Sequence, residues 1–180
     1  MIFESYYWKL PLIESAQRIK ELVQAKNEIT EQELVQLEKD IFIGFYSIRK
    51  LLEAPGKITD LARAKTVELN CHTNLSQVDW LNSHKLDRIY NITNSNQETH
   101  PILFVCGRII HSFVFAPVIS DIGVLEAIAF TSDIDKNKKL YKISAVAVPE
   151  LFELFGNDDV VRLVSFRDPN TGEMKVSGAF

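Results

Sequence analysis

Three polar side chains interrupt an apolar stretch near the middle of the chain: Arg108, His111 and Ser112, in the sequence Gly-Arg-Ile-Ile-His-Ser. Residues three and four apart share one face of a helix, so on a helix these side chains would lie together. An arginine can hold a phosphate group, and a histidine, whose pKa lies near neutrality, can move protons. This combination suits cleavage of RNA through its 2′-hydroxyl without a metal ion.

The same residues also fit a purely structural role, and their spacing alone favours it. A buried arginine is costly unless a carboxylate neutralises it. Arg108 would then pair with Glu53, Glu98 or Asp121, and His111 would form a hydrogen bond within the core.

The secondary structure of residues 102–115 decides whether these side chains meet. As a strand, the segment would place its polar residues on both faces, whereas as a helix it collects them in one stripe. We therefore predict a buried helix that ends at Pro117.

A second predicted helix could add groups to such a site. Tyr46 and Arg49 are three residues apart, so they share a face, and Lys50 follows directly. We name Ser112, Tyr46 and Arg49 as candidate binding residues. The alternative, which we favour for Arg49 and Lys50, is that basic residues simply suit the negative end of a helix.

This second helix has the clearest boundaries in the sequence. Thr30 and Glu33 form a capping box at its start, and Ala54-Pro55-Gly56 ends it. Residues 41–48 are apolar nearly all round, which is typical of a helix inside a bundle. Gly44 costs about 1 kcal/mol of helix propensity relative to alanine, so we expect a neighbouring helix to approach it closely.

The first helix is predicted to start at Pro11, after four aromatic residues. These aromatics either seal the core, which we favour because aromatic side chains bury large areas, or form a stripe that docks a partner. They are Phe3, Tyr6, Tyr7 and Trp8.

The remaining patterns predict strands and short helices. Thr59 would cap a short helix, residues 67–72 alternate as in a strand, and residues 91–100 indicate a loop. Two strands are expected over 124–131 and 139–144, a short helix from Pro149 to Gly156, and a hairpin from 160–166 and 173–177.

Helices first and strands later indicate an α+β fold. We predict one domain over residues 1–180, in which an N-terminal helical bundle (about 1–118) is followed by a small antiparallel sheet with one short helix (about 119–180).

Composition narrows the classes of partner. The 180 residues carry 20 basic and 24 acidic side chains, a net charge of −4, so no duplex DNA binding is expected. We see no secretory signal, and the apolar stretches are too short or too polar for a membrane span. A cytoplasmic protein with reduced thiols is the expectation.

The cysteines and histidines match no known metal-ligand spacing, so we predict no metal and no other cofactor. They are Cys71, His72, His84, His100 and Cys106.

The segment Phe-Ile-Gly-Phe-Tyr-Ser-Ile-Arg-Lys-Leu-Leu-Glu, followed by a helix containing Arg-Ile-Ile-His-Ser, resembles the HEPN superfamily over about residues 30–117. The family consists of small helical bundles in bacterial toxin–antitoxin and defence systems, and many members are metal-independent RNases that act as dimers. The resemblance implies that Arg108 holds the phosphate and His111 is the general acid/base. The family usually has four to six residues between the two, whereas this chain has only Ile109 and Ile110.

Two functions follow as hypotheses. The leading one is an intracellular interaction module without catalytic activity, of the kind found in defence or toxin–antitoxin systems, that binds another protein or itself through its helical part. The alternative is a metal-independent HEPN-like RNase that uses Arg108 and His111 on RNA.

Overall fold

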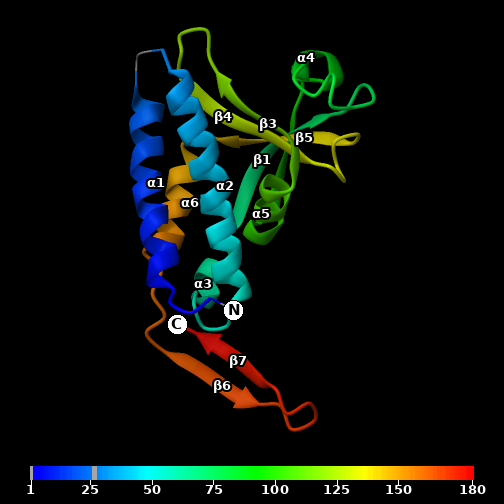
Figure 1. Ribbon diagram of the computed structural model, residues 1–180. Helices are drawn as coiled ribbons and strands as arrows, with labels where there is room; N and C mark the ends of the chain where they lie inside the picture. Colours follow the sequence, from blue (N-terminus) through cyan, green and yellow to red (C-terminus); the bar gives the residue numbers. More distant parts are fainter. Residues whose placement is uncertain (1, 26–27) are drawn as a thin grey trace.

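The computed structural model describes residues 2–25 and 28–180 and combines helices with an antiparallel sheet, as predicted for an α+β protein (Figure 1). The helices are α1 (Tyr6–Gln24), α2 (Glu31–Glu53), α3 (Asp60–Arg63), α4 (Leu86–Ile89), α5 (Ile102–Ile110) and α6 (Ala147–Gly156). The strands are β1 (Thr66–Thr73), β2 (Asn96–Pro101), β3 (Ser112–Ile119), β4 (Leu125–Ser132), β5 (Lys139–Ser144), β6 (Leu163–Arg167) and β7 (Met174–Ala179).

Five strands form one sheet in the order β2-β1-β5-β4-β3. Three of them, β1, β2 and β3, begin before residue 118, so the predicted division into a helical part and a sheet part at about residue 118 is wrong. The β4–β5 hairpin alone would leave two unpaired edges and bury little, and β1 and β3 pair with those edges. Residues 91–100, predicted as a loop, contain most of β2, whose polar residues suit the edge of the sheet.

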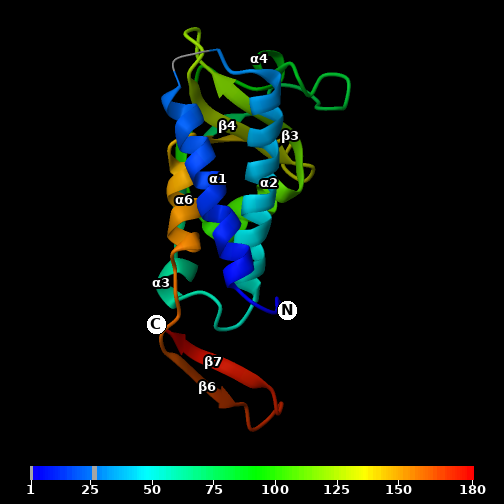
Figure 2. The same cartoon turned by 60° about the vertical axis from the view of Figure 1, so that its left-hand side comes forward.

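Helices α1, α2 and α6 lie side by side beside the sheet in both ribbon views (Figures 1 and 2). The capping box of α2 is present, with the Thr30 side chain accepting from the Glu33 backbone. The Phe152 side chain of α6 packs directly against Gly44, in line with the expected neighbouring helix. A Cβ on Gly44 would lie 2.1 Å from Cζ of Phe152, so a larger residue there would have to displace the Phe152 ring.

Helix α1 begins at Tyr6, a full turn earlier than predicted, and Pro11 lies inside it. The extra turn brings Trp8 against the core and within 6.1 Å of the Tyr46 ring. The other three N-terminal aromatics do not seal the core: Phe3, Tyr6 and Tyr7 are 97%, 58% and 74% exposed.

The segment 102–115 is a helix only as far as Ile110, where His111 is the C-cap. The chain then enters β3, so the predicted helix to Pro117 is wrong in its second half. Pairing with β4 satisfies the backbone of β3, and this tertiary contact outweighs the single polar stripe that favoured a helix.

One face of the sheet is buried against the helices, and part of the other face is buried under a second cluster. The main core packs residues such as Phe130 and Tyr141 against the helices. A smaller cluster on the opposite face covers Leu140 and Ala129 with Tyr90 and its neighbours. Strand β2 leads directly into α5, so Glu98 and His100 on the helix-facing side of β2 lie next to this helix.

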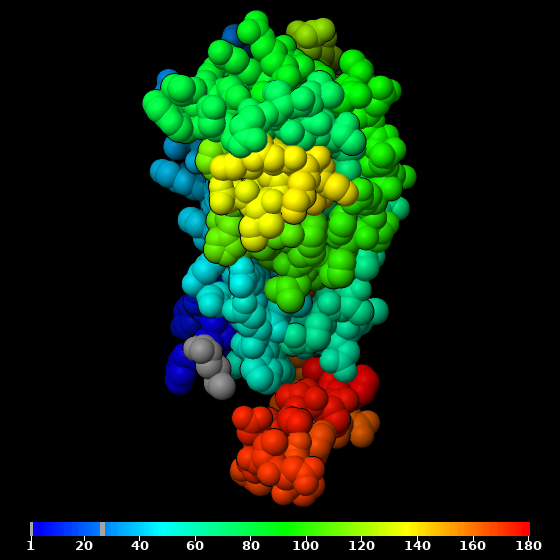
Figure 3. Space-filling view, turned by 90° about the vertical axis from the view of Figure 1, so that its right-hand side faces the viewer, coloured from blue at the N-terminus to red at the C-terminus, as the bar shows by residue number. Residues whose placement is uncertain are grey.

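The predicted C-terminal hairpin, β6–β7, forms a separate two-stranded sheet. It projects from the end of the molecule away from the five-stranded sheet (Figures 1 and 3). At its root, the Ala179 backbone N–H donates to Asp60 and the Leu163 side chain covers Gly56.

Candidate functional site

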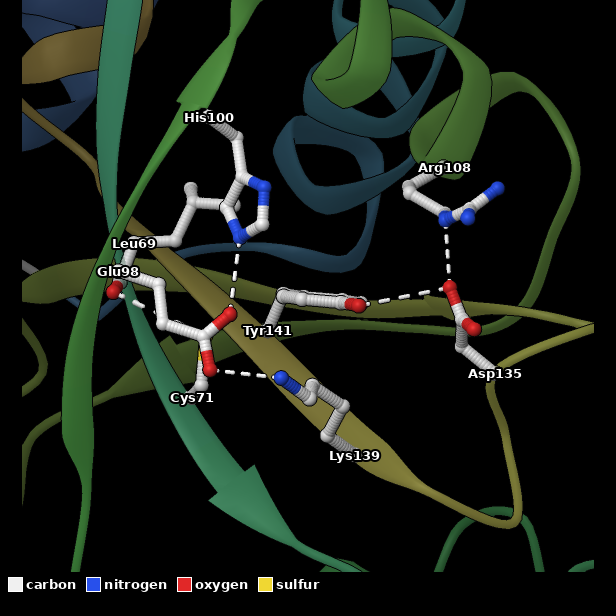
Figure 4. A network of polar contacts seen from close by, with 8 residues as sticks. All are labelled: Leu69, Cys71, Glu98, His100, Arg108, Asp135, Lys139 and Tyr141. Atoms are coloured by element: carbon white, nitrogen blue, oxygen red, sulfur yellow. Dashed lines mark hydrogen bonds and ion pairs between the residues drawn. The ribbon is translucent and has the colours of Figure 1, made fainter.

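Arg108 has a carboxylate partner, as the structural interpretation expected, but it is none of the three predicted. Its Nε lies 2.5 Å from Oδ2 of Asp135, in the turn between β4 and β5 (Figure 4). The guanidinium also lies over the ring of Phe104, 4.5 Å from its centroid. Asp135 is almost fully buried, so this pair fixes the end of α5 against the sheet.

His111 faces a different element from Arg108. It is exposed rather than bonded within the core, and its Nε2 lies 3.4 Å from Nη1 of Arg49 on α2. Arg49 in turn donates to Glu53 at 2.7 Å. The structure therefore brings His111 together with Arg49, a predicted binding residue, while Arg108 contacts Asp135.

The two other predicted binding residues, Ser112 and Tyr46, lie in different surroundings. Ser112 is the first residue of β3, opposite Ser132. Its Oγ is buried and has no hydrogen-bond partner among the described residues. Tyr46 is 42% exposed, and the Lys50 ammonium lies 5.4 Å from its ring centroid.

A polar cluster that the sequence interpretation missed occupies the helix-facing side of β1, β2 and β5. Glu98 on β2 is its centre (Figure 4). Its Oε1 accepts from Lys139 at 2.6 Å, and its Oε2 lies 3.0 Å from Nε2 of His100. Cys71 lies beside them, with donor atoms of Cys71, Glu98 and His100 all within 4.8 Å of one another.

Aromatic rings hold this cluster from the side of α5. The His100 ring stacks on Phe104 at 4.2 Å, and Tyr141 meets both rings edge-on. The Tyr141 hydroxyl donates to Asp135 at 3.4 Å, which connects the cluster to the Arg108 pair. Burial raises the pKa of Tyr141 to about 12, so its hydroxyl stays protonated at neutral pH.

Charge and burial set the protonation of the cluster. The hydrogen bond from Lys139 holds the pKa of Glu98 below its ordinary value, so Glu98 is a carboxylate at neutral pH. Burial and the neighbouring Glu98 charge raise the pKa of Cys71 to about 11. A neutral thiol is a poor nucleophile, so this arrangement does not activate Cys71 for covalent catalysis.

The signal for this cluster was present in the sequence. Glu98 and His100 are two residues apart, the spacing that places two side chains on one face of a strand. Once residues 96–101 are known to be a strand, Glu98 pairs with Leu69 and lies diagonal to Cys71. Lys139 and Tyr141 follow from the pairing of β5 with β1, which no local pattern predicts.

The C-terminal hairpin presents the second candidate surface. We use the term hairpin surface for its apolar residues, which are exposed on both faces of the two strands and next to them. They are Val161 88%, Leu163 50%, Val164 39%, Phe166 48%, Met174 56%, Val176 36% and Phe180 58%.

The remaining findings concern membrane-spanning helices and similarity to known proteins. Within residues 2–25 and 28–180, none of the helices combines the length and the apolar character that crossing a membrane requires. A scan against protein-family models, a search of curated proteins and a search of solved structures each found no match to this chain.

Proposed function

We propose that this protein is an interaction module that associates with a second copy of itself through the free edge of β6. The observation that carries the proposal is the hairpin surface, where strands β6 and β7 leave large apolar side chains exposed. Exposed apolar patches of this kind mark sites of association. The proposal moves the interaction site from the helical part, where the sequence suggested it, to the C-terminal hairpin.

The hairpin is too small to bury its own apolar side chains. A two-stranded sheet is marginally stable in water, and three or more strands with a covered face are needed for independent stability. Each strand also has one unpaired edge, which can pair with another chain. Edge pairing with a second copy would give a four-stranded sheet.

The backbone of β6 fits such pairing about Ser165. The backbone groups of Arg162 and Asp168 bond to the β7 side of the hairpin. Since backbone groups alternate along an antiparallel strand, those of Leu163, Ser165 and Arg167 point to the free edge. Two β6 strands related by a two-fold axis at Ser165 would therefore exchange hydrogen bonds at these three positions.

The side chains in this register are complementary. Val164 of one copy lies opposite Phe166 of the other, which gives two apolar cross-strand pairs. Arg162 of one copy lies opposite Asp168 of the other, which gives two pairs of opposite charge. No like charges face each other between residues 162 and 168 of the two copies.

Ser165→Pro tests the proposal in the full chain. Proline removes the N–H that Ser165 directs to the free edge, and it is tolerated on edge strands because that N–H bonds nothing within the hairpin. We expect a dimer for the wild type and a monomer for Ser165→Pro by sedimentation velocity. Ser165→Ala, which keeps the N–H, should remain a dimer.

Phe166→Lys is a second test that leaves the backbone of β6 intact. It replaces the apolar cross-strand pairs by a lysine opposite Val164, and we expect it to weaken the dimer as well. Circular dichroism of each variant establishes that the fold is retained. A monomeric wild type, or a dimer that survives both Ser165→Pro and Phe166→Lys, would contradict the proposal.

The exposed contact between Arg49 and His111 favours a second candidate function, a metal-independent RNase. An arginine beside an accessible histidine is the pairing that phosphate binding and proton transfer require. In this version Arg49 holds the phosphate, because it lies beside His111 and its partner Glu53 is exposed, whereas Arg108 is paired with the buried Asp135.

If the protein is such an RNase, it cleaves single-stranded RNA in the presence of EDTA. His111→Ala should then reduce cleavage by about 10²–10⁴-fold, the usual contribution of a general acid or base. His84→Ala removes another exposed histidine and should leave the rate unchanged. Equal cleavage by wild type and His111→Ala would rule out this function.

A further inference from the structure

We propose that Cys71, Glu98 and His100 form a binding site for a zinc ion between strands β1 and β2. The sequence interpretation rejected a metal because the spacing of cysteines and histidines matched no ligand pattern. The fold supplies the missing ligand, Glu98, and brings together residues that are up to 29 positions apart in the chain.

The three donor atoms are those that zinc prefers. Zinc in proteins is bound by cysteine sulfur, histidine nitrogen and carboxylate oxygen, and three protein ligands leave a fourth position open. Harder ions such as Mg²⁺ and Ca²⁺ favour oxygen ligands alone, so the sulfur and the imidazole nitrogen argue against them.

The distances between the three donor atoms are close to those of a zinc site, so only a small adjustment of the side chains is needed. Bond lengths of zinc sites imply ligand atoms roughly 3.2–3.8 Å apart in a tetrahedron. Here Nε2 of His100 and Oε2 of Glu98 are 3.0 Å apart, and the sulfur of Cys71 lies within 4.8 Å of both. A zinc ion between them would replace the hydrogen bond from imidazole to carboxylate.

The surroundings already hold the ligands in place. Glu98 binds Lys139 through Oε1, which leaves Oε2 for the metal, and this kind of outer contact orients metal ligands in known sites. The His100 ring is fixed by its stack on Phe104. Cys71 is 4% exposed, so its sulfur points into the interior beside Glu98 and not into solvent (Figure 4).

The charges also balance. A bound zinc ion deprotonates a coordinating thiol. The thiolate of Cys71 and the carboxylate of Glu98 would then neutralise the two positive charges of the ion, with His100 as a neutral ligand. Lys139 remains paired with the oxygen of Glu98 that does not bind the metal.

Direct metal binding tests the site in the full-length protein. After dialysis against EDTA, Zn²⁺ alone is titrated in competition with a chromophoric chelator. We expect one equivalent to bind, and Cys71→Ala, Glu98→Gln and His100→Ala each to weaken binding by at least about tenfold. Cys106→Ala and His84→Ala, which change a cysteine and a histidine outside the site, should bind as the wild type does.

Cobalt provides a second readout, which reports directly whether sulfur is a ligand. Co²⁺ bound to a thiolate gives a sulfur-to-metal charge-transfer band in the near ultraviolet, and we expect this band in the wild type and in Cys106→Ala but not in Cys71→Ala. Glu98→Gln keeps the shape of the side chain but removes its charge, so a loss of binding in this variant points to the carboxylate as a ligand. The proposal would be overturned if the wild type bound no Zn²⁺. It would also be overturned if Cys71→Ala and His100→Ala bound Zn²⁺ as tightly as the wild type does.

Discussion

Replacing Phe152 by alanine is expected to lower the free energy of unfolding by about 3–5 kcal/mol. The Phe152 ring is fully buried, meets the Phe45 ring edge-on at 5.4 Å, and fills the space over Gly44 where α6 crosses α2. Its removal leaves a cavity that the backbone of two packed helices cannot close. Chemical denaturation followed by circular dichroism measures the change.

Phe166→Ala is the matched control for this prediction. Phe166 is 48% exposed on the C-terminal hairpin, so its loss should change monomer stability by no more than about 0.5 kcal/mol. If Phe152→Ala were as mild as Phe166→Ala, the close contact between α2 and α6 would not be a central part of the core. Measurements at low protein concentration keep any association of the hairpin out of the comparison.

Replacing Asp40 by asparagine is expected to lower the free energy of unfolding at pH 7 by about 2–3 kcal/mol. Asp40 on α2 is 5% exposed and accepts hydrogen bonds from two residues of α1. Arg18 donates through Nε at 2.9 Å and Nη2 at 2.6 Å, and Ser15 donates at 2.8 Å. The substitution leaves charged donors without a carboxylate at the contact between the two helices.

The effect of Asp40→Asn should depend on pH in a defined direction. Burial acts to raise the pKa of Asp40, but the hydrogen bonds from Arg18 and Ser15 outweigh it and hold the pKa below its ordinary value. A carboxyl whose pKa is lower in the folded state stabilises the protein above its unfolded pKa, about 3.9. The difference between wild type and variant should therefore be complete near neutrality and shrink as pH falls below about 4.

Glu53→Gln is the control on the same helix. Glu53 pairs with Arg49 and Lys50 at the exposed end of α2, where an ion pair contributes about 0–1 kcal/mol. A constant difference between wild type and Asp40→Asn from pH 7 to pH 3 would show that the carboxylate charge is not what stabilises the contact between α1 and α2.

Local patterns sufficed for elements that are defined by their own ends. The capping box at Thr30, the glycine after Pro55 and the turn 168–172 are short-range signals, and α2 and the β6–β7 hairpin formed as predicted. Gly44 predicted the close approach of a helix because a glycine inside a helix is costly without compensation. The identity of that helix, α6, required the structure.

Long-range pairing explains the errors. The residues of β3 carry an apolar pattern that suits a buried helix as well as a buried strand, and only pairing with β4 distinguishes the two. The polar residues of β2 resemble a loop until β1 lies beside them. Arg108 and His111, adjacent in a helical projection, contact different elements because the helix ends between them.

By itself, the sequence determined the α+β class, the ends of α2, the C-terminal hairpin and the need for a carboxylate partner of Arg108. Only the tertiary structure decided that this partner is Asp135, that His111 meets Arg49, and that Cys71, Glu98 and His100 lie together. The physical reason is that helix caps and turns are satisfied by neighbouring residues, whereas a sheet joins distant segments whose register no local pattern encodes.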